Sequence, residues 1–215
     1  MATYLQLVNN VLARLRESSV ASVSTNAYSS LIGKFVNDAK RQVEDAWNWE
    51  SLYTTITVTT SAGTSGYTLT GAGYRFKIDS VNNTTDQYPL NNVSLKFIKD
   101  IQQTASTDNG SPTYYAISGN SSGDATVEFY PTPDSTQTIK FNIYKPQADL
   151  SDDADVLTIP SEAVIAGAYA RALVERGEDG GLSSSEAYGL YKGILADQIA
   201  LEAARHIESE CWVAV

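Results

Sequence analysis

The stretch PTYYAISGNSSGDATVEFYPTPDSTQTIKFNIYKP, residues 112–146, has the composition of a β-structure. Its aromatic and β-branched residues gather in three runs, at 114–118, 126–130 and 138–144. Turn-forming sequences, GNSSGD and PTPDSTQ, separate the runs. In the last run Ile139, Phe141 and Ile143 alternate with polar residues, as in a strand with one buried face. We therefore predict three strands joined as an antiparallel meander.

The β-pattern continues towards the N-terminus. Over residues 53–60, Thr alternates with Ile56 and Val58, which indicates a half-buried strand. Further short strands are expected in YRFKIDSV and QYPL, and a short helix in SLKFIKDIQQ. Five of the six prolines lie between 89 and 146. The β-region is therefore predicted to span residues 51–148.

Both ends of the chain show helical spacing instead. A first helix is indicated by apolar residues at Leu5, Val8, Leu12 and Leu15. A second helix is predicted over 27–47, with its N-cap supplied by Ser24, Thr25 or Asn26. Its apolar stripe lies opposite a predicted polar face of Lys34, Asp38, Lys40 and Arg41. Trp47 and Trp49 end this helix, and we expect them to seal the junction between the helices and the β-insert; ordinary core packing is the alternative.

Two more helices are predicted after residue 149. Pro160 and Glu162 suit the first turn of one helix, and Gly177 suits its C-cap. Ser183 and Glu186 match a capping box for the last helix. The buried side of that helix is expected to carry Ala187, Leu190, Tyr191, Ile194, Leu195 and Leu201.

An amphipathic helix needs a partner that covers its apolar stripe. The predicted fold class is therefore α+β. Residues 1–50 and 149–215 form one discontinuous helical bundle, and residues 51–148 form an antiparallel β-sandwich or meander inserted between them.

Composition excludes several classes of chemistry. The chain has one cysteine, Cys211, and one histidine, His206, so a disulfide within the chain and the usual zinc sites are excluded. The aspartates at 149–155 resemble a calcium loop in composition only, because the turn glycine and the closing glutamate are missing, and a solvated linker is expected. We predict no catalytic residue, no cofactor and no metal.

Charge is distributed unevenly. The net charge is −10, and residues 149–215 hold 13 acidic and 4 basic side chains. Such a surface repels phosphates, so sequence-specific DNA binding is not expected. The sequence also lacks a membrane-spanning run and a secretion signal, so we expect synthesis in the cytoplasm and no membrane partner.

Three stretches in this order resemble the head-to-tail adaptor (connector) proteins of tailed bacteriophages, including the tail tubular protein A type. They are LVNNVLARL with FVNDAKRQVEDAWNW, the opening stretch PTYYAISG with VEFYPTPDSTQTIKFNIYKP, and LTIPSEAVIAGAYARALVERGED. The resemblance implies a non-enzymatic structural protein of the virion. Such proteins form a ring, typically of twelve copies, under the portal protein at the head-tail interface, where tail or nozzle proteins attach and DNA passes without specific binding.

The resemblance also implies roles for particular residues. The C-terminal segment of such proteins reaches the portal or a neighbouring copy, which makes Trp212 the expected anchor of a docking segment formed by Cys211, Trp212, Val213, Ala214 and Val215. The acidic balance of the last helices suggests that they line the DNA channel, with Glu175, Asp197, Glu202 and Glu208 as the candidates.

Other functions remain open at the level of sequence. The first is a β-sandwich module that binds a glycan or a host surface, with the helices as an oligomerising stalk. For that function, aromatic side chains from among the thirteen tyrosines and three tryptophans of the chain would have to gather on one exposed face. The others are an enzyme of unrecognised type and another assembly role, such as capsid or tail completion.

Overall fold

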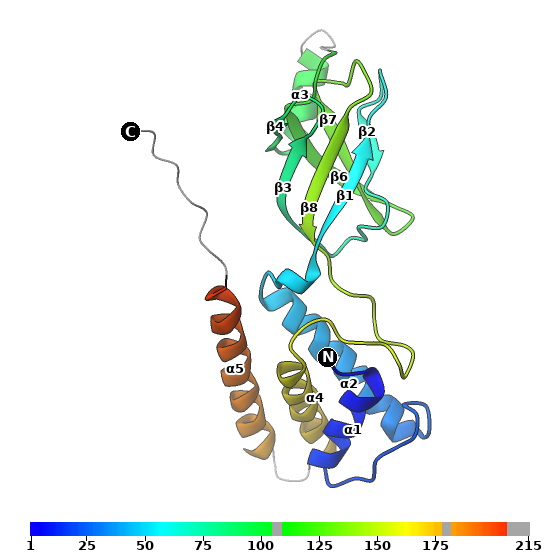
Figure 1. Cartoon of the computed structure of the whole chain (residues 1–215), viewed down its shortest axis with the longest axis vertical. Helices are drawn as coiled ribbons and strands as arrows, with labels where there is room; N and C mark the ends of the chain where they lie inside the picture. The colour runs from blue at the N-terminus through cyan, green and yellow to red at the C-terminus, as the bar shows by residue number, and fades with distance from the viewer. Residues whose placement is uncertain (105–108, 178–181, 206–215) are drawn as a thin grey trace. The chain divides into compact units, whose positions relative to one another are not determined.

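The computed structural model describes residues 1–104, 109–177 and 182–205. The chain folds as two units (Figure 1). The helical unit comprises Met1–Ser51 and Gln147–Val215, and the β unit comprises Leu52–Pro146. The α+β fold class, with a bundle made from both ends of the chain, is confirmed.

Four helices build the helical unit: α1 (Tyr4–Arg14), α2 (Ala27–Ala46), α4 (Ser161–Arg176) and α5 (Leu182–Ala203). Capping boxes start α1 at Thr3 and α2 at Asn26, one of the three predicted caps. Gly177 ends α4 with a left-handed φ of 62°, as predicted, whereas Pro160 is the N-cap residue just before the first turn in which it was expected. The last helix begins at Leu182, so Ser183 lies inside it and is not its N-cap.

Helix α4 is the centre of the helical unit, because α1, α2 and α5 all pack against it. A helix surrounded in this way is buried on every side rather than along one stripe. Residues 163–168 of α4 are accordingly all buried, and most are alanine or glycine. The small side chains allow the helices to approach closely.

The β unit is a sandwich of two four-stranded sheets, ordered β1-β8-β3-β4 and β2-β7-β6-β5. A short 3-10 helix, Glu50–Leu52, leads into it, and α3 (Leu95–Thr104) packs on β6 and β7. The strands are β1 (Tyr53–Thr59), β2 (Gly66–Thr68), β3 (Lys77–Asn83), β4 (Tyr88–Pro89), β5 (Asn91–Asn92), β6 (Tyr114–Ser121), β7 (Asp124–Tyr130) and β8 (Thr138–Tyr144).

The inward-facing residues of both sheets form one core. Phe141 lies at its centre, with its ring centroid 5.6 Å from that of Tyr115 and 6.1 Å from that of Phe129. The alternation predicted for β8 is confirmed, because Ile139, Phe141 and Ile143 are fully buried.

The predicted three-strand meander is wrong. β6 and β7 form an antiparallel hairpin, but β8 lies in the other sheet between β1 and β3. Pro131 and Pro133 follow β7 and have no backbone N–H to donate, so they end the pairing where the chain crosses to the other sheet. The short strands β2 and β5 were also not predicted, and β5 pairs parallel to β6.

The tight packing around α4 predicts the effect of adding one methyl group. A Cβ on Gly167 would lie 3.1 Å from Tyr191 Cε2 and 3.2 Å from Ala39 Cβ. We expect Gly167→Ala to lower the free energy of unfolding by about 1–3 kcal/mol, because the core has no room for it. Urea unfolding of the free chain measures the effect.

Gly193 on α5 provides the matched control, since a Cβ there would meet no atom within 4 Å. Gly193→Ala should be neutral or stabilising by up to about 1 kcal/mol, because alanine favours the helix. Equal losses for the two variants would contradict the packing described for α4.

Candidate interaction surfaces

Lys40 and Glu44 form an ion pair that is completely buried inside the helical unit. They stand one turn apart on α2, both side chains are 0% exposed, and Lys40 Nζ lies 3.0 Å from Glu44 Oε1. Lys40 Nζ donates to the backbone carbonyl of Gln147 at 2.6 Å, and Glu44 Oε1 accepts from the backbone N–H of Gln147 at 3.0 Å. The pair therefore binds both the N–H and the C=O of Gln147, the residue at which the chain re-enters the helical unit. The placement of Lys40 on a polar face was wrong, because its charge is satisfied inside the fold.

The side chain of Gln147 extends this anchor. Its Nε2 donates to the carbonyl of Val156 at 2.7 Å, and its Oε1 accepts from the N–H and the hydroxyl of Thr158 at 3.2 and 3.1 Å. We call residues 147–160 the return segment, because they lead from the end of the β unit to α4. The side chain of Gln147 therefore links the start of the return segment to Val156 and Thr158 near its end.

Three of the four aspartates of the return segment, Asp149, Asp153 and Asp155, have structural partners, so the expectation of a solvated linker holds only for Asp152. Arg41 forms an ion pair with Asp149, and the Asp153 carboxylate accepts from the N–H of Val23 at 2.9 Å. The Asp155 carboxylate accepts from the N–H groups of Ser151 and Asp152. These bonds tie the segment to α2 and to the loop before it.

The same hydrogen bonds lower the pKa values of two of these aspartates. The N–H of Val23, with a smaller contribution from the Ser22 hydroxyl, lowers the pKa of Asp153. The N–H groups of Asp152 and then Ser151 lower the pKa of Asp155. A carboxylate that accepts backbone N–H bonds favours its charged form.

Helix α5 leaves a largely apolar face uncovered. Leu190 is 61% exposed and Leu201 is 56% exposed, although both were predicted to be buried. Together with Ile194 they recur at spacings of four and seven, and we call these three residues the α5 outer face. Ala187 and Tyr191 are buried as predicted, because they face α4. Apolar residues lie on more than one side of α5, so periodicity alone did not show which side meets α4.

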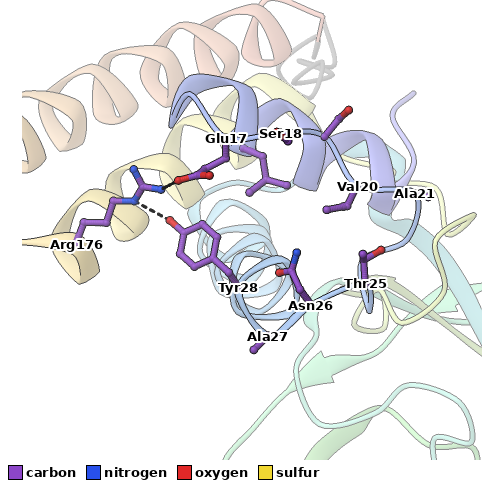
Figure 2. Close-up of a pocket in the computed structure, with 11 residues that line it drawn as sticks. Glu17, Ser18, Val20, Ala21, Thr25, Asn26, Ala27, Tyr28 and Arg176 are labelled. Carbon is purple, nitrogen blue, oxygen red and sulfur yellow. Dashed lines mark hydrogen bonds and ion pairs between the residues drawn. The ribbon is translucent and has the colours of Figure 1, made fainter.

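A pocket of about 730 Å³ lies between the loop after α1, the start of α2 and the end of α4 (Figure 2). Arg176 borders it: Nε donates to the Tyr28 hydroxyl at 2.9 Å, another nitrogen forms an ion pair with Glu17, and the third reaches the Leu15 carbonyl at 3.4 Å. The guanidinium carbon lies 5.3 Å from the centre of the Tyr28 ring. Because all three nitrogens have partners, Arg176 holds helices together here.

The two junction tryptophans lie just before the chain enters the β unit. Trp49 is buried, and its Nε1 donates to the carbonyl of Val43 at 2.7 Å. Trp47 is the C-cap residue of α2 and is half-buried. Whether they seal the junction stays a prediction.

The predicted acidic residues occupy different environments. Glu175 and Asp197 are exposed. The Glu202 carboxylate accepts from the N–H of Glu50 at 3.0 Å and pairs with Arg205 at 3.4 Å. Glu208 and the docking residues 211–215 lie outside the described residues. These channel and docking roles stay predictions.

The described residues offer little for the other functions. Among them no three His, Cys, Asp or Glu side chains gather as a metal site, and no helix is both long enough and apolar enough to cross a bilayer. The most exposed aromatic side chains of the β unit are Tyr53, Tyr74 and Phe97, and they come from β1, the loop before β3, and α3.

A protein-family model described as SU10 adaptor protein matches residues 2–209, which is nearly the whole chain. The chain belongs to the SU10 adaptor protein family. The resemblance to phage head-to-tail adaptors is confirmed by this match, and the chain has the structural role of a phage adaptor. Membership of the SU10 adaptor family also implies a location in the virion. No curated protein matches the chain.

In this SU10 adaptor the buried ion pair makes a clear prediction. Lys40→Ala leaves Glu44 without its buried cation, and we expect a loss of about 3–5 kcal/mol in the free energy of unfolding. The double variant Lys40→Met with Glu44→Leu should lose less than the single variant, because no buried charge remains. Urea unfolding measures both.

Lys34→Ala is the control, since Lys34 lies on the same helix but is exposed. Its effect should stay within about 0.5 kcal/mol. The anchor would be refuted if Lys40→Ala and Lys34→Ala gave the same stability.

The lowered pKa of Asp153 predicts a pH dependence. Stability from this carboxylate is fully present above its ordinary pKa near 3.8 and is lost as the pH falls through the lower folded-state value. Asp153→Ala should therefore be less stable than the parent at pH 7, and the difference should shrink as the pH falls below 3.8.

Urea unfolding at a series of pH values between 7 and 3 tests this. Asp152→Ala is the matched control, because Asp152 is exposed and its carboxylate has no hydrogen bond in the described part of the chain. A constant difference between Asp153→Ala and the parent at every pH would contradict the assignment.

Proposed function

We propose that this SU10 adaptor assembles as a ring of identical copies, twelve in number, beneath the portal protein. The ring links the capsid to tail or nozzle proteins and forms part of the channel through which DNA passes. The proposal includes a non-enzymatic role and synthesis in the host cytoplasm before incorporation into the virion. It rests on the family match together with the α5 outer face, which is the observation that carries it.

The α5 outer face supports subunit contacts for a physical reason. Two leucines more than half exposed on one helix face are costly in water, and a neighbouring subunit would bury them. A ring needs one surface on each subunit that meets a different surface on the next. In the proposal the helical unit makes these contacts, and the β unit faces outward or towards the tail.

The acidic charge of residues 149–215 supports the proposed DNA channel. A conduit for DNA works best when its wall repels phosphate, and residues 149–215 carry 13 acidic and 4 basic side chains. We propose Glu175, Asp197, Glu202 and Glu208 as channel residues, with Glu202 contributing less because its carboxylate is already bonded to Glu50 and Arg205. Residues 211–215 dock onto the portal or a neighbouring copy through Trp212, because aromatic anchors often dominate interface energy.

The α5 outer face gives the decisive prediction. In Leu190→Ser with Leu201→Ser, each serine removes about 1.5–3 kcal/mol of apolar burial at the contact. The concentration needed for half-assembly on the portal should therefore rise at least about tenfold, while the free chain stays folded because both leucines are exposed. Native mass spectrometry of the chain mixed with the portal of the same phage measures copy number and assembly.

Val174→Ser is the matched control, because Val174 is an exposed apolar residue, 68% accessible, on α4 outside the α5 outer face. It should assemble like the parent. The proposal fails if the parent forms no defined complex with the portal. It also fails if the double variant, Leu190→Ser with Leu201→Ser, assembles as well as Val174→Ser.

A further inference from the structure

One sheet edge of the β unit is much longer than the others. Three of the edge strands, β2, β4 and β5, have only three, two and two residues. β1 is the fourth edge strand, with seven residues, and it pairs with β8 on one side only (Figure 1). Short edge strands are a common protection against pairing with other chains, and β1 lacks this protection.

The register shows which backbone groups of β1 are open. Beyond the two ends of the strand, Thr60 donates to the Gln137 carbonyl and Lys145 donates to the Leu52 carbonyl, both at 2.9 Å. Hydrogen-bonded residues alternate along an antiparallel pair, so the even-numbered residues of β1 bond to β8. The N–H and C=O groups of Tyr53, Thr55, Thr57 and Thr59 therefore point to the open edge.

Nothing in the described part of the chain covers this edge. No described residue bonds to the backbone of Thr55, Thr57 or Thr59, and all three are exposed. The strand contains no charged residue, no proline and no bulge, which are the usual devices that block edge pairing. Ile56 points to the core but is only half-buried, so a further strand would cover it.

Symmetry limits which strand of another copy can pair with the open edge of β1. Pairing β1 with β1 of another copy is a two-fold contact, which cannot continue around a ring. The other edge strands have at most three residues. A strand that matches all seven residues of β1 must therefore come from an extended segment outside the two sheets.

The sequence contains such a segment after the last described residue. Ten residues follow Arg205, about 33 Å when extended. Within them 209–215 contains no proline or glycine and is rich in strand-forming residues. Residues 211–215 are all apolar, and in a strand Cys211, Val213 and Val215 lie on one face while Glu210, Trp212 and Ala214 lie on the other.

We propose that residues 209–215 of one copy add as a strand to the open edge of β1 in a second copy. Cys211, Val213 and Val215 continue the inner face beside Ile56 and Val58, and the side chains between them continue the outer face. Main-chain hydrogen bonds to Thr55, Thr57 and Thr59 provide the affinity, as in other cases of strand addition. The proposal deepens the proposed function, on which it rests, by naming the neighbouring copy as the docking site of this segment.

A disulfide trap tests the contact, because Cys211 is the only cysteine in the chain. Ile56→Cys should yield a ladder of disulfide-linked oligomers when the portal-bound ring is oxidised and run on a non-reducing gel, because Ile56 faces the same side of the sheet as Cys211 in the proposal. Each copy then carries both halves of the link. Lys96→Cys is the matched control, an 82% exposed side chain on α3, and it should give no ladder.

A second measurement does not depend on cysteine. Amide hydrogen exchange at Thr55, Thr57 and Thr59 should slow at least about tenfold on assembly, because these N–H groups gain partners. Thr57→Pro should weaken the contact and cancel this protection at Thr55 and Thr59 without unfolding the β unit, since Thr57 donates no bond to β8. Thr57→Val is its control and should behave like the parent.

The outcomes separate the two proposals. A ring on the portal with rapid exchange at these amides and no ladder overturns strand addition and leaves the proposed function standing. A ladder in concentrated free chain, without any complex with the portal, supports strand addition and overturns the proposed function. Dimers that persist in Ile56→Cys with Cys211→Ser, or a link within one chain, overturn the assignment to a second copy.

Discussion

The structure of the helical unit depends on two charges that are removed from water. Lys40 and Glu44 are both fully buried, and the backbone of Gln147 supplies hydrogen bonds to each of them. A buried ion pair is weak evidence for stability, but leaving one partner alone is costly. The pair therefore specifies where the return segment lies, since any other path would leave the two charges without these partners. The position of α4, and through it α5, follows from this path.

The two proposed contacts differ in their physical character. The α5 outer face offers apolar area, which binds without direction, whereas the β1 edge offers a row of backbone donors and acceptors that accepts a partner in few registers. An adaptor needs both properties, because area supplies affinity and register fixes the rotation between neighbours. Neither contact requires a reactive side chain, which agrees with the structural role of the family.

Much of the fold could be predicted from the sequence, because periodicity and caps are local signals. The stripes of α1 and α2, the cap at Gly177 and the alternation in β8 are examples. The sheet to which β8 belongs could not be predicted, since it depends on pairing between distant strands. The burial of Lys40 was also missed, because a Lys-Glu pair four residues apart is usually a surface pair. Leu190 and Leu201 were misplaced because an isolated chain does not reveal which apolar face its neighbours cover.

The entry and exit of the β unit also lie close together. Lys145 donates a hydrogen bond to the carbonyl of Leu52, the first residue of the unit, at 2.9 Å. On the helical side, Gln147 is held by α2, the helix after which the chain leaves. A different insert with neighbouring ends would therefore meet the same attachment points as residues 52–146. Such an exchange would let the β unit vary among phage adaptors while the helical bundle stays the same.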